Sequence, residues 1–159
     1  MVVEKRATIE LINESDKVSL YSISFEADGT TEFEKFVFEF EQNATYNRDY
    51  QRIIAALQAI LQVGALERFF RPEGKMADSV QALPLMSGKL RLYCLRISDH
   101  IVILGNGGVK TTRTYEEDSR LYGYVLDLQK FERLLSQCIK EGRVIIEEKT
   151  LMGINNVTF

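Results

Sequence analysis

The sequence predicts one α+β domain, in which an antiparallel β-sheet carries two amphipathic helices from the first half of the chain. Two observations predict this class. Segments with strand-like alternation flank a helical region, and the connections between the later strands have the length of hairpin turns. A chain of 159 residues with 45% hydrophobic side chains also suits a single core. We expect residues 1–159 to form one domain, with an extra N-terminal hairpin strand and a C-terminal helix added to the sheet.

The first expected elements are a β-hairpin and a capped helix. Residues 3–12 and 18–26 alternate β-branched and polar side chains on either side of the turn-forming segment 13–17. Thr31 and Glu34 then have the spacing of a capping box. Apolar residues follow at helical intervals: Phe33, Phe36, Val37 and Phe40. The chain therefore begins with a hairpin followed by a helix.

A second, longer helix and three strands should form the middle of the domain. The apolar stripe of this helix ends near Gly64 and consists of Tyr50, Ile53, Ile54, Leu57, Ile60 and Leu61. Segments 80–85, 89–97 and 100–105 read as strands. Because their connections are short, we expect them to lie antiparallel.

The last part of the sequence predicts a loop, a helix and a late strand. Residues 115–124 are expected to form the loop. Asp127 then offers an N-cap and Gly142 a C-terminal end to a helix. Its apolar side is made of Leu128, Phe131, Leu135 and Cys138. Residues 143–149 suit a strand.

Composition excludes several classes of protein. No apolar run approaches the roughly 20 residues that span a bilayer, and the N-terminus lacks the apolar centre of a signal peptide, so we expect a cytoplasmic protein without membrane contact. Cys94 and Cys138 are the only cysteines and His100 is the only histidine. This supply excludes a Cys/His zinc site and a histidine-dependent triad. We expect no metal and no cofactor.

Positive charge is concentrated in the middle of the chain. The balance of Lys and Arg against Asp and Glu is −5 over residues 1–63, +4 over residues 64–113 and −2 over residues 114–159. An anionic partner for the middle region is therefore worth considering.

The segment ILGNGGVKTTRTY, residues 103–115, allows three interpretations. A phosphate-binding P-loop requires Gly directly before the Lys and a helix directly after it, whereas Val109 precedes Lys110 here and no apolar helical stripe follows. A Gly-rich turn is the second interpretation, since Asn106-Gly107 is a common hairpin signal. The third is that the cations around it form a binding surface.

The strand KLRLYCLRI supports that third interpretation. Alternation places Lys89, Arg91 and Tyr93 on one face. After Cys94 the alternation inverts, and a β-bulge at Cys94-Leu95 would bring Arg91, Tyr93 and Arg96 onto one surface. Two guanidinium groups beside an aromatic ring suit a phosphodiester backbone with an unstacked base.

The order of these motifs resembles a known family. Two amphipathic helices are followed by a strand of the type Leu-Arg-Leu-Tyr-x-Leu-Arg, here Leu90 to Arg96, and by a buried strand, Ile101 to Gly108, that ends in Gly and leads to Lys110 to Thr112. Over about residues 20–115, and most clearly over 65–115, the chain resembles the RelE/HigB superfamily of toxins from bacterial toxin–antitoxin pairs. Residues 116–159 would be a C-terminal extension.

This resemblance implies an mRNA endonuclease that often acts on the ribosome and needs no metal. It also implies that an antitoxin holds the enzyme inactive, so the expected partners are a helix-turn-helix antitoxin and RNA. A base would take the proton of a ribose 2′-hydroxyl, which attacks the adjacent phosphate. We assign Arg91 and Arg96 as phosphate clamps, and Lys110 and Arg113 as charge stabilisers. Tyr93 or Tyr115 would provide the ring that stacks on a base or relays a proton. Further contacts to the RNA backbone would come from Arg68, Arg71 and Lys75.

Other interpretations of the same residues stay open. Arg91 and Arg96 could pair with carboxylates of the N-terminal hairpin, and Tyr93 could be sheet packing. Arg68 and Arg71 could instead interact with the end of the second helix, where positive charge suits the dipole. At the level of function, the alternatives are a non-catalytic adaptor that binds a protein or nucleic acid through the same sheet, and a DNA-binding regulator.

Overall fold

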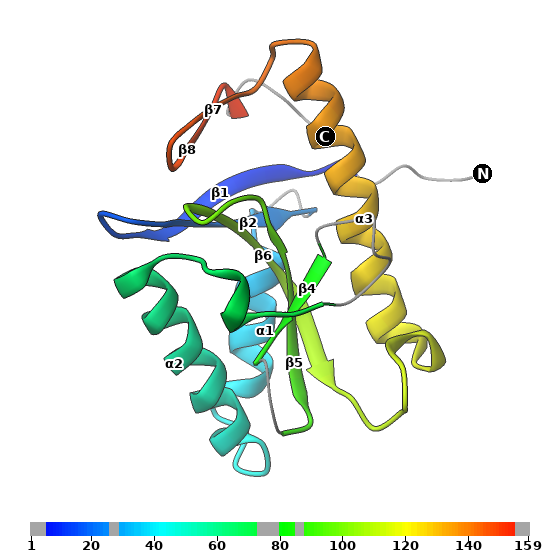
Figure 1. Cartoon of the computed structure of the whole chain (residues 1–159). Coiled ribbons are helices and arrows are strands. Elements are labelled where there is room, and N and C mark those ends of the chain that lie inside the picture. Colours follow the sequence, from blue (N-terminus) through cyan, green and yellow to red (C-terminus); the bar gives the residue numbers. More distant parts are fainter. Residues whose placement is uncertain (1–5, 26–28, 73–79, 85–87, 155–159) are drawn as a thin grey trace, which may run out of the picture.

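The computed structural model describes residues 6–25, 29–72, 80–84 and 88–154. It confirms the α+β class: a mostly antiparallel six-stranded sheet has helices on both faces (Figure 1). The helices are α1 (Glu32–Phe40), α2 (Asn47–Val63) and α3 (Ser119–Lys140), with short 3-10 helices η1 (Glu67–Phe69) and η2 (Tyr115–Glu117). The strands are β1 (Thr8–Glu14), β2 (Ser19–Ser24), β3 (Arg71–Pro72), β4 (Val80–Leu83), β5 (Leu90–Arg96), β6 (Ile101–Val109), β7 (Ile145–Glu147) and β8 (Thr150–Met152).

The sheet has the order β1-β2-β6-β5-β4-β3, and β7 and β8 form a separate two-stranded sheet. The later strands lie antiparallel as predicted, but β2 runs parallel to β6, with Leu20 opposite Val102. A parallel neighbour requires a long crossover, and here the chain from α1 to β5 supplies it. The Ser22 hydroxyl donates to the Leu104 carbonyl at 2.7 Å across this pair and accepts from the Phe33 amide at 3.2 Å, which sets the start of α1 against the end of β2.

The predicted capping box of α1 is confirmed. The Glu34 amide donates to the Thr31 hydroxyl at 3.1 Å, and the Thr31 amide donates to the Glu34 carboxylate at 3.4 Å. The second helix also ends where the sequence predicts, because Gly64 at its C-terminus has a φ of 113° that other residues rarely adopt. Local sequence signals therefore determine both helices of this half.

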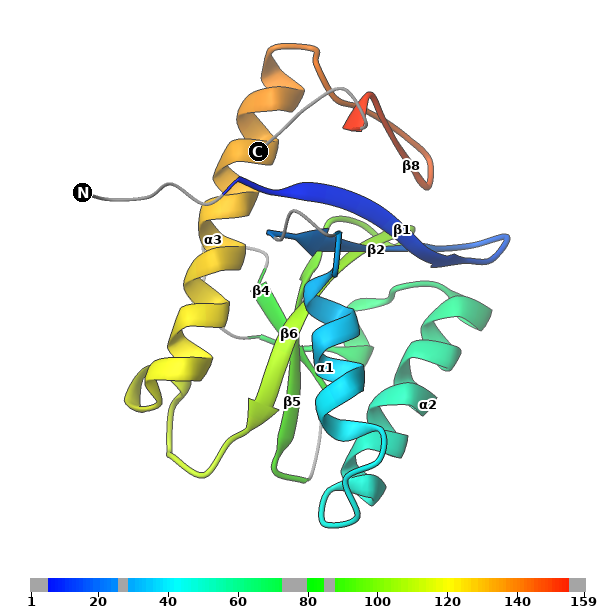
Figure 2. The same cartoon turned by 180° about the vertical axis from the view of Figure 1, so that it is seen from behind.

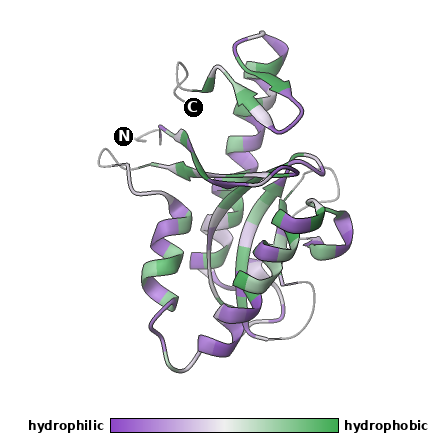
Figure 3. Ribbon diagram, turned by 90° about the vertical axis from the view of Figure 1, so that its left-hand side faces the viewer, coloured by the Kyte–Doolittle hydropathy of each residue, from purple (hydrophilic) through white to green (hydrophobic). Residues whose placement is uncertain are grey.

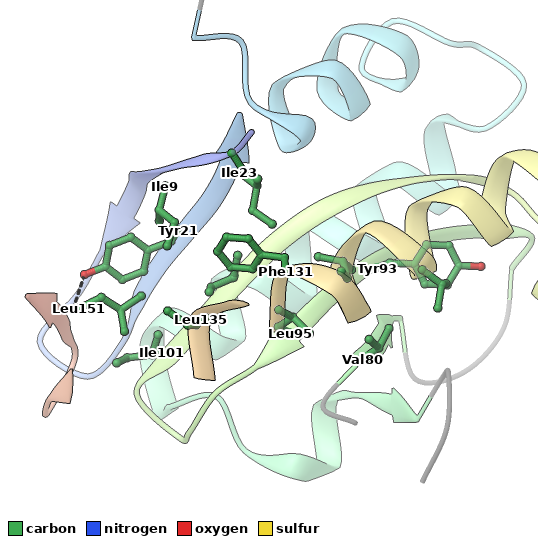
Figure 4. Close-up of a cluster of buried hydrophobic side chains, with 14 of the residues drawn as sticks. Ile9, Tyr21, Ile23, Val80, Tyr93, Leu95, Ile101, Phe131, Leu135 and Leu151 are labelled. Carbon is green, nitrogen blue, oxygen red and sulfur yellow. Dashed lines mark hydrogen bonds between the residues drawn. The ribbon is translucent and has the colours of Figure 1, made fainter. Parts of the chain in front are cut away.

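Two apolar layers cover the two faces of the sheet. The layer between the sheet and the helices α1 and α2 includes Phe36, Ile53 and Leu92. On the opposite face α3 packs its buried stripe onto β4, β5 and β6, and Figure 4 shows Phe131 and Leu135 of α3 among side chains of the strands. Figure 2 shows α3 and the pair α1 and α2 on different sides of the strands. Helices thus cover both faces of the central strands.

The start of α3 differs from the sequence prediction. Asp118, not Asp127, is the N-cap: its carboxylate accepts from the amides of Arg120 and Leu121 at 3.0 and 3.1 Å. The expected loop over 115–124 is wrong, since most of it belongs to η2 and α3. The buried Val125 and Leu121 continue the stripe one and two turns, respectively, towards the N-terminus from Leu128. A glycine and two tyrosines between them obscure this periodicity in the sequence.

The C-terminal segment forms a hairpin rather than one strand. Residues 143–149 were expected to be extended, and β7 pairs with β8 over three residue pairs. None of the helices within the described ranges is long and apolar enough to cross a membrane.

Candidate functional site

The alternation predicted for β5 is confirmed. Leu90, Leu92 and Cys94 lie in the apolar layer of α1 and α2. Tyr93 and Leu95 lie in the layer of α3. The strand therefore presents its predicted faces to two different helical layers.

The predicted bulge at Cys94-Leu95 is wrong. Both residues and Arg96 pair in continuous register with β6, and Cys94 and Leu95 also pair in register with β4. Arg96 consequently lies on the face opposite to Arg91 and about 17 Å farther along the strand, at about 3.4 Å per residue. The two predicted phosphate clamps do not share a surface.

The irregular step lies instead in β6, where the glycines are. Between the pairs Leu92–Gly107 and Cys94–Leu104, β6 contains one residue more than β5. A Cβ on Gly107 would lie 1.8 Å from the Arg91 carbonyl oxygen, and one on Gly105 would lie 3.0 Å from the Tyr93 carbonyl oxygen. The Gly-rich segment is therefore a bulge pressed against β5, and neither a phosphate-binding loop nor a hairpin turn.

Arg96 has a structural role at the closed end of the β5–β6 hairpin, which we define as Arg96, Asp99 and Ile101. Its Nε donates to the carbonyl oxygen of the buried Ala65 at 2.7 Å, and its guanidinium pairs with Asp99 and, at 3.8 Å, with Glu67. These carboxylates do not belong to the N-terminal hairpin that the sequence suggested. Arg96 joins the loop after α2 to the β5–β6 connection and is only 17% exposed.

Arg91 and Tyr93 lie beneath α3. Arg91 is 7% exposed, and its NH1 group donates to the carbonyl oxygens of Gly88 and Leu90 at 2.8 and 3.1 Å. Tyr93 is fully buried in the layer that Figure 4 shows. The packing interpretation of Tyr93 agrees with this position, and a nucleotide base cannot stack on its ring in this conformation.

Exposed cations remain at the open end of the same hairpin, which we define as Lys89, Arg91, Gly108 and Lys110. The Lys110 amide donates to the Lys89 carbonyl oxygen at 2.7 Å, which extends the β5–β6 ladder by one pair. Because Arg91 pairs with Gly108, alternation places Lys89 and Lys110 on the α3 side as well. Lys89 is exposed and Lys110 half-buried, and neither makes an ion pair with another described residue.

The loop after the open end adds one cation and two rings. Arg113 is exposed, and its amide donates to the Glu117 carboxylate at 3.3 Å. Tyr115 is 9% exposed and stacks on Tyr122 with ring centroids 6.1 Å apart. Tyr122, which sequence reasoning missed, is 39% exposed at the start of α3. Its spacing of seven residues from Tyr115 is the only signal that could have indicated it.

The other predicted RNA contacts lie elsewhere or are not described. Arg68 lies in η1 with its guanidinium 5.3 Å from the centre of the Phe69 ring, and Arg71 lies in the edge strand β3. Both belong to the side of the molecule near the loop after α2, whereas Lys110 and Arg113 follow β6. Lys75 lies outside the described residues.

A small pocket lies where β2 ends beside the bulge of β6. Its lining includes Glu32, Asn106 and Tyr124 from three different elements, and it has room for about one water molecule. Glu32 pairs with Lys35 at 3.0 Å, and the Tyr124 hydroxyl accepts from Arg120 at 2.9 Å. The pocket is too small for a nucleotide. The ion pair between α1 and α3 lies outside its lining and joins Glu39 to Arg120.

Cys94 and His100 complete the set of groups that the sequence offered for thiol or metal chemistry. Burial raises the pKa of the Cys94 thiol well above its ordinary value, so this cysteine stays protonated and unreactive. His100 is exposed in the β5–β6 connection, where its Nδ1 lies 2.9 Å from the Lys17 carbonyl oxygen. Within the described ranges, no group of three or more His, Cys, Asp or Glu residues could hold a metal ion.

Comparisons with known proteins identify no relative: no family model, no curated protein and no solved structure matches the chain.

Proposed function

We propose that this chain is a toxin-like RNA-binding protein of the RelE/HigB type, and that it binds and cleaves single-stranded RNA at the open end of the β5–β6 hairpin. The observation that carries the proposal is the pairing of Lys89 with Lys110 on the side that also presents the stacked Tyr115 and Tyr122. Ammonium groups neutralise phosphates, and an exposed ring accepts an unstacked base.

The residues to which we assign catalysis differ from those predicted from the sequence. Arg91, Tyr93 and Arg96 are engaged in the fold, so the charge on the reacting phosphate falls to Lys89, Lys110 and Arg113. Glu117, whose carboxylate accepts from the Arg113 amide, supplies a carboxylate beside Arg113. It would take the proton of a ribose 2′-hydroxyl while the 2′-oxygen bonds to phosphorus and the bond from phosphorus to the 5′-oxygen breaks. The leaving 5′-oxygen takes its proton from solvent water. The products are a 2′,3′-cyclic phosphate and a 5′-hydroxyl end.

Binding is tested by fluorescence anisotropy with a labelled single-stranded RNA over a range of salt concentrations. The triple variant Lys89→Ala/Lys110→Ala/Arg113→Ala should bind at least tenfold more weakly and lower the slope of log K against log salt by about 2. The matched control Arg68→Ala/Lys130→Ala/Lys140→Ala removes the same charge from exposed positions elsewhere. Equal losses in the two variants would contradict a site at the open end.

Cleavage is tested separately from binding. The wild type, in the presence of EDTA, should produce cyclic phosphate ends from RNA and leave a 2′-O-methyl RNA bound but uncut. Glu117→Gln should retain RNA affinity and lose cleavage. Expression of the wild type should also arrest bacterial growth, and a variant that binds but does not cut should not.

A non-catalytic adaptor is the second candidate. It is favoured by the positions of three of the five predicted catalytic residues. Arg91 and Tyr93 are buried, and Arg96 donates to the Ala65 carbonyl oxygen. An adaptor predicts a wild type that neither cuts RNA nor slows growth. Such a protein would act through its surface rather than through its sheet, since helices cover both sheet faces.

A further inference from the structure

We infer that the C-terminal hairpin β7–β8 is a docking site for another polypeptide, one that presents apolar side chains flanked by Lys or Arg. This surface lies at the other end of α3 from the proposed RNA site. The 22 residues of α3 separate the two by about 33 Å at 1.5 Å per residue, so the inference does not depend on RNA binding.

Exposed apolar side chains gather at this end of the molecule. Eight large hydrophobic side chains are exposed among the described residues, and four of them belong to β1, β7 and β8. These four are Leu11 at 49%, Ile145 at 53%, Ile146 at 40% and Met152 at 44% exposed. The other four are distributed over three helices. Figure 3 shows the apolar colour of the hairpin at the edge of the molecule.

The register of the hairpin explains which side chains face outward. Ile146 and Leu151 lie opposite each other on the inward face, where Leu151 is buried against the sheet and Ile146 remains 40% exposed. Ile145 lies opposite Met152 on the other face, so these two side chains are neighbours and both point away from the core. Their exposure is therefore a property of the register and not of an isolated residue.

The hairpin is fixed to the sheet before any partner binds. The Leu151 amide donates to the Tyr21 hydroxyl at 3.1 Å, a bond that Figure 4 shows. Lys149 donates to the Ser15 carbonyl oxygen at 2.9 Å and pairs with Glu14 at 3.3 Å. A surface held at two points is pre-organised, which lowers the entropy cost of binding.

Charge determines the chemistry of the occupant. Glu147 and Glu148 are exposed at the turn beside the apolar pair, and neither makes an ion pair with another residue in the described ranges. The neighbouring cations are already engaged, Lys149 by Glu14 and Arg143 by Glu141. These carboxylates disfavour an anionic membrane and a second copy of the same face, and they favour a basic partner.

The first experiment uses two labelled peptides of 14 residues as probes, one of alternating Leu and Lys and one of alternating Leu and Glu. The wild type should bind the Leu-Lys peptide at least tenfold more tightly than the Leu-Glu peptide. Ile145→Ser/Met152→Ser should weaken Leu-Lys binding at least tenfold. The matched control Phe38→Ser/Leu134→Ser, which removes exposed apolar side chains from α1 and α3, should change it less than twofold. Equal losses in the two variants would overturn the inference.

A second variant leaves the apolar side chains in place. Glu147→Lys/Glu148→Lys should reverse the preference between the two peptides, and an unchanged preference would overturn the assigned chemistry. Two further measurements distinguish the other occupants. Sedimentation that shows a dimer of the wild type and a monomer of Ile145→Ser/Met152→Ser would assign the surface to a second copy. Binding to phosphatidylserine vesicles that the same variant loses would assign it to a membrane. Either result would overturn the proposal of a basic polypeptide.

Discussion

The two ends of the β5–β6 hairpin carry the same type of side chain in opposite situations. At the closed end, Arg96 donates to a buried carbonyl oxygen and pairs with Asp99. At the open end, Lys89 and Lys110 form the last pair of the ladder, and neither makes an ion pair with another described residue. The difference arises from the surroundings. The connection beside Arg96 offers acceptors to its guanidinium, whereas at the open end the Asp49 carboxylate accepts from the Lys89 backbone amide at 2.9 Å. The role of a cation on this hairpin is therefore set by the end of the strand at which it lies.

The largest effect should come from the bulge between the two ends. Gly107→Ala would place a methyl group 1.8 Å from the Arg91 carbonyl oxygen, and backbone cannot move aside as a side chain can. We expect a loss of about 3–5 kcal/mol in the free energy of unfolding, measured by urea denaturation. Gly108→Ala is the control, because its methyl group would meet only the flexible end of Leu121 at 3.2 Å. Similar losses for the two variants would show that the bulge does not have this geometry.

The second prediction separates structural from functional cations. Arg96→Met should lower the free energy of unfolding by about 2 kcal/mol, because it leaves the buried Ala65 carbonyl without its donor. Asp99→Asn should cost about 0.5 kcal/mol, since that carboxylate is exposed. Both variants should bind the labelled RNA as the wild type does. A loss of RNA affinity in a stably folded Arg96→Met variant would show that both ends of the β5–β6 hairpin contribute to RNA binding, which would contradict the prediction.

The smallest effect compares the half-buried Lys110 of the open end with the exposed Arg68 of η1. Lys110→Ala should lower the slope of log K against log salt for single-stranded RNA by about 0.7, the value for one phosphate contact. Arg68→Ala should leave this slope unchanged. Each should alter the free energy of unfolding by less than about 0.5 kcal/mol in thermal melts. An Arg68 effect equal to that of Lys110 would mean that RNA binds over the whole surface.

Sequence reasoning was most successful where the signal is local. The capping box of Thr31 and Glu34 and the apolar stripe of α2 depend on neighbours one turn away, and both were predicted. The alternation of β5 was also predicted, because it reflects the period of a single strand. Local periodicity thus predicted the class of the fold and the faces of its strands.

The site was harder to predict because burial depends on distant segments. Alternation placed Arg91 and Tyr93 on one face, yet only the packing of α3 decides whether that face meets water. The first turns of α3 read as a loop because Gly123 and its tyrosine neighbours interrupt the stripe. The bulge was assigned to β5 from its inverted pattern, whereas the glycines of β6 provide it. The sequence pattern of one strand does not show which of two paired strands contains the extra residue of a bulge.

The parallel pairing of β2 with β6 has a consequence for folding during synthesis on the ribosome. The Ser22 hydroxyl and the Leu104 carbonyl that it binds are 82 positions apart in the chain. Contacts of such separation form slowly, because a long loop must close before they contribute any stability. The N-terminal hairpin therefore emerges early and waits for the middle of the chain, with Leu20 and Ile23 still in contact with water. Until β6 has been synthesised, the inner edge of β2 has no strand to pair with.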